Sequence, residues 1–63
     1  DKITLRWNKI QEYLKIHDYI MNADVRELCG VSVATANRIL AGFVADGKLV
    51  KYREGGHWAY ILS

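Results

Sequence analysis

Hydrophobic side chains in the first quarter of the chain follow the spacing of one helix face. The stripe consists of Trp7, Ile10, Leu14 and His17. Charged residues fall largely on the other side, so the pattern predicts an amphipathic helix over about residues 4–17, with Thr4 as its N-cap. The short run at residues 19–21 that follows predicts a brief extended segment.

Two further helices joined by a glycine are expected next. Asn22 is a typical capping residue and Gly30 suits the left-handed position after a helix, so a short helix is expected between them. Ser32 is expected to cap a third helix over residues 33–45, which Gly47 ends. This order is the signature of a helix-turn-helix. The third helix is expected to bury Ala36, Ile39, Leu40, Phe43 and Val44.

The last third of the chain has the character of β-strands. Residues 49–53 are rich in Val, Tyr and Leu, and residues 57–62 carry large side chains with a period of two. Between them, Glu54-Gly55-Gly56 forms a turn cluster, so a hairpin is expected. The chain is therefore predicted to be an α+β winged helix-turn-helix of three helices and a C-terminal two-stranded wing. Residues 1–63 are expected to form one domain of a longer protein.

Composition argues against several function classes. The chain has 63 residues, 51% of them hydrophobic, and a single cysteine, Cys29, which cannot form an internal disulfide. A reducing, cytoplasmic location is therefore expected, with Cys29 buried and inert. The spacing of His17, His57 and Cys29 does not suit zinc, and no P-loop or membrane span is present. We expect no enzyme activity, cofactor or metal.

A resemblance to known families covers nearly the whole chain. Residues 22–40 (NADVRELCGVSVATANRIL) resemble the helix-turn-helix of bacterial winged-helix proteins, and residues 43–50 (FVADGKLV) resemble the segment leading into their wing. The end, Tyr60-Ile61-Leu62, is similar to their last strand. The chain most resembles the C-terminal winged helix of Fic-family proteins and of divergent ATP-binding transcriptional regulators, and more loosely DeoR and MarR regulators. The resemblance implies a DNA-binding module of a bacterial transcriptional regulator or Fic-type protein.

Within that resemblance, the outward side of the third helix and the wing are the expected DNA-binding surfaces. Arg38 suits guanine and Asn37 suits adenine, whereas Thr35 suits a phosphate or a thymine methyl. Ser32 at the helix N-terminus suits a phosphate, as do the cations near the wing tip. The candidate nucleic-acid-binding residues are Ser32, Ala34, Thr35, Asn37, Arg38, Lys51, Arg53 and His57.

Simpler interpretations remain open at each position. Ser32 can be only a cap, Arg38 only a solvated charge, and the wing cations only a hairpin rim. The net charge of +2 is a mild excess that does not demand nucleic acid. Arg38 is also the only cation on the exposed side of the third helix. The alternative function is therefore a protein-interaction or autoregulatory winged helix with little DNA affinity.

The aromatic residues do not predict a stacking platform for bases. Trp7 lies on the apolar stripe of the first helix, and Tyr60 occupies a core-facing position of the wing in the families that the chain resembles. Leu40 and Tyr60 are expected to be buried together with Leu14 and Leu28. Trp58 is expected to stay half exposed.

Overall fold

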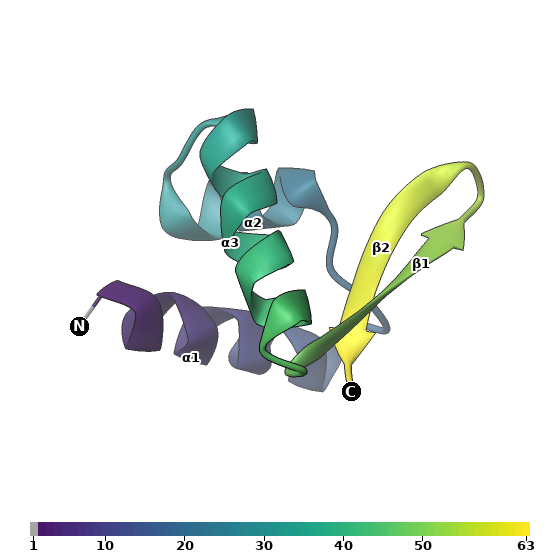
Figure 1. Cartoon of the computed structure of the whole chain (residues 1–63), viewed down its shortest axis with the longest axis horizontal. Coiled ribbons are helices and arrows are strands. Elements are labelled where there is room, and N and C mark those ends of the chain that lie inside the picture. Colours follow the sequence, from purple (N-terminus) through teal and green to yellow (C-terminus); the bar gives the residue numbers. More distant parts are fainter. Residues whose placement is uncertain (1) are drawn as a thin grey trace.

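Three helices precede an antiparallel hairpin in the computed structural model, which describes residues 2–63 (Figure 1). The elements are α1 (Lys2–Ile16), α2 (Asn22–Cys29), α3 (Val33–Ala45), β1 (Leu49–Glu54) and β2 (His57–Leu62). This layout confirms the predicted α+β winged helix-turn-helix fold. The prediction that Thr4 caps the first helix is wrong, because α1 is already helical at Lys2.

The start of α2 differs from the prediction in its capping residue. Met21, with extended backbone, is the N-cap, and Asn22 is the first helical residue. The Met21 N–H donates to Asp24 Oδ2 at 2.9 Å, so a carboxylate in the first turn supplies the acceptor that a polar cap would give. The Asn22 amide instead donates to the Val33 carbonyl at 3.2 Å and to Asn37 Oδ1 at 2.8 Å. Asn22 therefore ties α2 to α3.

The turn between α2 and α3 follows the prediction. Gly30 has φ 63 and ψ 44, the left-handed conformation in which glycine has no Cβ penalty, and its N–H donates to the Arg26 carbonyl. Ser32 then caps α3 with its hydroxyl oxygen, which accepts from the Thr35 N–H at 3.3 Å. The predicted end of α2 and start of α3 are confirmed.

The wing is a two-residue hairpin with a third extended segment at its side. Glu54 pairs with His57, which leaves Gly55 and Gly56 as the turn, both with positive φ. This conformation matches the twist of the flanking strands. On the other edge of β2, Ile20 and Tyr60 exchange two backbone hydrogen bonds of 2.9 Å, which confirms the extended segment before α2. The hairpin is therefore held to the helical part through the connection between α1 and α2.

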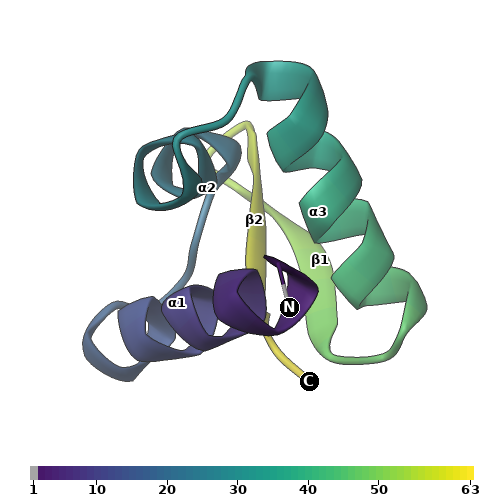
Figure 2. The same cartoon turned by 90° about the vertical axis from the view of Figure 1, so that its left-hand side faces the viewer.

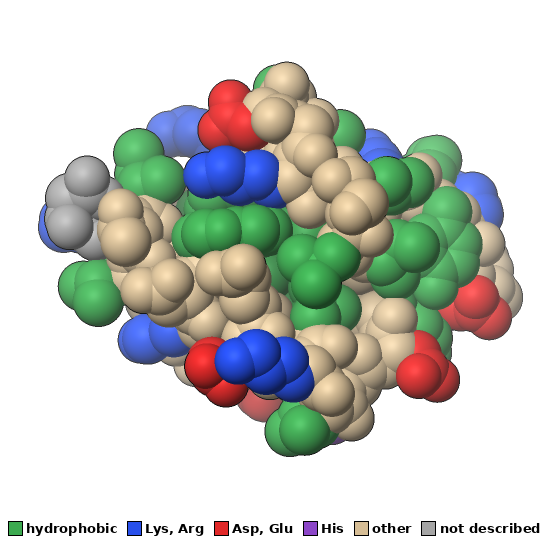
Figure 3. Space-filling model, turned by 90° about the horizontal axis from the view of Figure 1, so that it is seen from below, with side chains coloured by type: hydrophobic (Ala, Val, Ile, Leu, Met, Phe, Trp, Pro, Cys, Tyr) green, Lys and Arg blue, Asp and Glu red, His purple; other side chains and the backbone are tan. Residues whose placement is uncertain are grey.

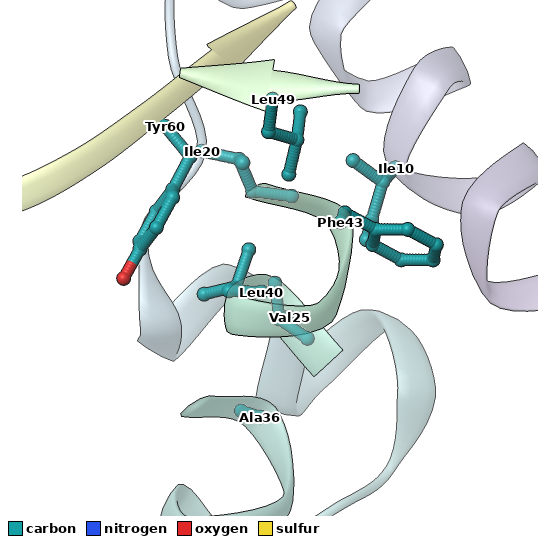
Figure 4. Packing of buried hydrophobic residues seen from close by; sticks show 8 residues of the cluster. All are labelled: Ile10, Ile20, Val25, Ala36, Leu40, Phe43, Leu49 and Tyr60. Atoms are coloured by element: carbon teal, nitrogen blue, oxygen red, sulfur yellow. The ribbon is translucent and has the colours of Figure 1, made fainter. Parts of the chain in front are cut away.

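Every element contributes to one buried cluster (Figure 4). Its members are Ile10, Ile20, Val25, Ala36, Leu40, Phe43, Leu49 and Tyr60. The predicted burial of Leu40 and Tyr60 is confirmed, but Leu14 and Leu28, which were expected to be buried with them, are only half-buried at the edge of the cluster. The Tyr60 hydroxyl points away from the other labelled side chains (Figure 4).

Two residues expected in the core lie at its margin. Cys29 is half-buried rather than buried, and lines a shallow depression with Leu5 and Lys9 of α1. It is the last residue of a helix only eight residues long, four positions after the buried Val25, and it packs against the edge of the cluster. Trp7 is also half-buried, with its ring centroid 4.9 Å from that of Phe43 and Lys48 Nζ 5.3 Å above it.

The helices leave one side of α3 uncovered. Figure 2 shows α3 at the outer side of the molecule, with α1 and α2 both on its inner side. The face seen from below is different in character, because hydrophobic side chains form a band across it and charges of both signs lie around them (Figure 3). Within residues 2–63 no single helix has the length and apolar character to cross a membrane. Only α2 and α3 taken together reach that length and apolar character, and they are bent by 105° relative to each other.

Truncating Leu40 tests the central packing. Leu40 has 0% of its surface exposed, so Leu40→Ala should lower the free energy of unfolding by about 2–5 kcal/mol, measured by urea denaturation. Leu40→Met, which preserves volume, should cost less than about 1.5 kcal/mol. Ile3→Ala, at a 62% exposed position, is the control and should change stability by at most about 0.5 kcal/mol. Equal losses for Leu40→Ala and Ile3→Ala would contradict this packing.

Tyr60 gives the fold a sensitivity to alkali. Burial raises the pKa of the Tyr60 hydroxyl above its ordinary value of 10.0. The unfolded chain therefore loses this proton near pH 10 while the folded chain keeps it to higher pH, so ionisation favours unfolding. The stability contributed by the neutral hydroxyl is complete below pH 10 and is lost as pH rises through the folded pKa.

We expect Tyr60→Phe to reduce the loss of stability above pH 10, as measured by urea denaturation at pH 8 to 11. Burial also raises the pKa of Tyr13 and Tyr52, but both remain in the variant and affect the two proteins alike. An unchanged alkaline decline in Tyr60→Phe would show that Tyr60 ionisation is not linked to unfolding.

Candidate nucleic-acid interface

The exposed side of α3 and the wing form the walls of a groove of about 800 Å³. The start of α2 completes its lining. The lining residues are Met21, Asn22, Ala23, Asn37, Ala41, Val44, Ala45, Lys51, His57, Trp58 and Tyr60. The α3 wall consists mainly of small side chains, whereas the wing wall carries a cation and an exposed aromatic ring. The groove therefore offers close access to the α3 backbone beside a positively charged wall.

Lys51 and Arg53 of the wing both lie against Trp58. Lys51 Nζ is 4.4 Å from the Trp58 ring centroid, and the Arg53 guanidinium carbon is 5.0 Å from it. The two cations are two residues apart on β1 and share a face of the sheet, and Arg53 is directly opposite Trp58 in the register. A cation over an exposed indole gains about 0.5–1 kcal/mol. Trp58 therefore holds two cations side by side on the wing.

Trp58 itself was not among the residues predicted to form the interface. Its exposed fraction of 48% confirms the expectation that it stays half exposed. Its pairing with Arg53 depends on the strand register, which the Gly55-Gly56 turn sets. The signal was present in the sequence, because a two-residue turn at these glycines places Trp58 opposite Arg53.

Asn37 lies in the groove with its side chain engaged. Its Oδ1 accepts a hydrogen bond from Asn22 Nδ2 at 2.8 Å. Bidentate recognition of adenine uses both the oxygen and the nitrogen of the amide. For Asn37 to read adenine in this way, the hydrogen bond from Asn22 must therefore be given up or shared.

Thr35 and Arg38 lie on the other flank of α3. Together with Ile3 and Arg6 of α1 they line a second depression of about 300 Å³. The charged residues of the first helix were expected on its outer side, but Arg6 is half-buried beside α3. Its position four residues before the buried Ile10 is the signal that could have placed it there. This flank carries two arginines.

The eight predicted residues thus fall into three groups. Asn37, Lys51 and His57 line the groove, whereas Thr35 and Arg38 line the second depression. Ser32, Ala34 and Arg53 line neither, although all three are exposed. The structure therefore brings wing and helix residues together on one side of α3 and leaves Arg38 on the other.

Gly42 borders the second depression without any packing requirement for glycine. A Cβ added there would meet no atom within 4 Å. Close packing of α3 on α1 therefore does not explain this residue. As for metal binding, residues 2–63 contain no group of three or more His, Cys, Asp or Glu side chains that could hold an ion.

The fold recurs in a larger bacterial protein. The chain is similar to part of the crystal structure of the DIP2311 protein from Corynebacterium diphtheriae, with a TM-score of 0.80 and 27% sequence identity over 100% of the present chain. The chain covers 11% of that protein, so the similarity concerns one small portion of it. No model of a protein family matches the chain, and no curated protein does.

The cap of α3 can be tested directly. Ser32→Ala removes the oxygen that accepts from the Thr35 N–H, so we expect it to lower the free energy of unfolding by about 1 kcal/mol. Ser32→Asp keeps an acceptor and should retain most of the stability. Thermal unfolding followed by circular dichroism measures both variants. A Ser32→Ala variant as stable as the unchanged chain would mean that α3 does not depend on this cap.

Proposed function

We propose that this chain is a DNA-binding module of a larger bacterial regulator or Fic-type protein, with α3 in the major groove and the wing on the phosphate backbone. The observation that carries the proposal is the groove between α3 and the wing, where small helix side chains face a cationic wall. This arrangement suits a helix-turn-helix that inserts its second helix into the DNA groove. The similarity to a small part of a long bacterial protein supports the modular role.

The dimensions of α3 suit this docking mode. Its 13 residues span about 20 Å, and a helix fits the major groove of about 12 Å width. Ala34 and Ala41 keep the exposed side narrow, which favours close approach. The side chains of Arg38 and Asn37 lie on different flanks of α3, so they would contact different bases.

The wing supplies phosphate contacts in this proposal. Lys51 and Arg53 are exposed and held together on Trp58. Each phosphate that such a cation neutralises releases counterions and adds a slope of about −0.9 to the dependence of log K on log salt. Within residues 2–63 few cations lie near α3, among them Arg6, Arg38 and Lys48, so we expect weak binding by one copy, with a dissociation constant on the order of 10⁻⁴–10⁻⁶ M.

A titration with duplex DNA at several salt concentrations tests the proposal. Lys51→Ala and Arg53→Ala should weaken binding to all sequences alike and flatten the salt slope by about one unit each. Lys15→Ala is the charge-matched control, because Lys15 is an exposed cation of α1 whose partner is Glu12, and it should leave the slope unchanged. Arg38→Ala should reduce discrimination between sites by roughly 1–3 kcal/mol if it reads a base.

Amide chemical shifts identify the surface that binds. Salt-sensitive shifts confined to α3 and the wing are the expected result. If random duplex at low ionic strength produces no salt-sensitive shift, or if Lys15→Ala acts as strongly as Lys51→Ala, the proposed DNA interface is wrong.

A protein-binding winged helix is the second candidate function. It is favoured by the apolar character of the groove, where Met21, Val44 and Trp58 join the alanines of α3. It is also favoured by the single exposed cation of α3, Arg38. Failure of the DNA titration would promote this function, in which the groove would receive an apolar segment of a partner.

A further inference from the structure

The outward side of α1 carries a stripe of four residues with an exposed aliphatic side chain at each end and two charges between them. Leu5 and Ile16 are 61% and 81% exposed, and Lys9 and Glu12 lie between them. Residues 5, 9, 12 and 16 are separated by four, three and four positions, so they share one face of the helix. The opposite side carries Ile10, which is fully buried in the core. This stripe therefore faces solvent and is bordered by the end of α2, where Lys9 reaches the Leu28 carbonyl.

The stripe is complementary to itself when two copies are placed antiparallel. With a two-fold axis between residues 10 and 11, Leu5 faces Ile16 of the second copy and Lys9 faces its Glu12. Each aliphatic side chain then meets another, and each charge meets its opposite. We propose that the outward face of α1 is a self-association surface through which two copies of this chain pair as antiparallel helices.

The charges of the stripe are free to exchange partners. Glu12 pairs with Lys15 at 3.2 Å, but both side chains are about 70% exposed, and exposed pairs of this kind contribute little. Lys9 Nζ donates to the Leu28 carbonyl at 3.2 Å, also at the surface. Neither interaction is buried, so both can give way to a pair across the two-fold axis.

The flank of the stripe offers room for the second copy. Leu28 of α2 and Tyr13 line a shallow depression of about 600 Å³ beside Leu5 and Ile16. An aliphatic side chain from the partner helix can enter it. The depression shares no lining residue with the groove between α3 and the wing, so self-association and DNA binding use separate surfaces and fail independently.

The size of the contact sets the expected strength. α1 has 15 residues and is about 22 Å long, so the paired helices bury less surface than the roughly 1,200 Å² of a standard stable interface. We therefore expect a weak dimer, with a dissociation constant on the order of 0.1–1 mM.

Reversing the charges of Lys9 and Glu12 tests the proposed dimer. Association is measured by sedimentation equilibrium of the 63-residue chain at up to about 1 mM, the top of the expected range of dissociation constants. Lys9→Glu and Glu12→Lys should each weaken dimerisation by about tenfold, since each sets like charges opposite each other twice per dimer. The double variant Lys9→Glu/Glu12→Lys restores opposite charges and should recover the original association. Leu5→Glu should abolish it, whereas Ile3→Glu, at an exposed position on another face of α1, should leave it unchanged.

Circular dichroism spectra establish that each variant is folded, which is expected because every changed residue is exposed. A chain that remains monomeric at about 1 mM would overturn the proposal, and would leave the stripe to another part of a parent protein. A dimer that survives Leu5→Glu, or a double variant no better than the single ones, would also overturn it.

Discussion

The two backbone hydrogen bonds between Ile20 and Tyr60 determine how the wing stands on the helical domain. They join the connection between α1 and α2 to β2, and both side chains enter the common core. A hairpin of two strands has little stability by itself. Here it gains a partner on its second edge and a buried face at Leu49 and Tyr60. The groove beside α3 exists because this attachment fixes the angle of the wing.

Which parts of the fold could be predicted depends on how far apart in the sequence the interacting residues lie. The helices and the hairpin follow from local periodicity and from the glycines at Gly30 and Gly55, because these signals act within a few residues. The cap at the start of α2 was less predictable, because Asp24 accepts the hydrogen bond from the Met21 N–H and Asn22 bonds to α3 instead. Choosing between two nearby polar side chains requires the position of a second helix, which no local pattern contains.

The candidate site was predicted as a set of residues but not as an arrangement. Lys51 and Asn37 do line one groove, whereas Arg38 belongs to the flank that Arg6 shares. Helical spacing shows that Asn37 and Arg38 are both exposed; it does not reveal that the wing lies beside one and α1 beside the other. The burial of Cys29 was also overestimated. Spacing within a helix of eight residues does not show how far neighbouring elements cover its last residue.

The stacking of Lys51 and Arg53 on Trp58 has a consequence for the thermodynamics of recognition. Long basic side chains usually lose rotamer freedom when they meet an anion, at about 0.5–1.5 kcal/mol each. On this wing the indole restricts both chains before any ligand arrives, so part of that conformational entropy is already lost in folding. Trp58 stays 48% exposed with both cations beside it. Under the proposed function, the wing is thus preorganised to contact phosphate rather than to distinguish bases.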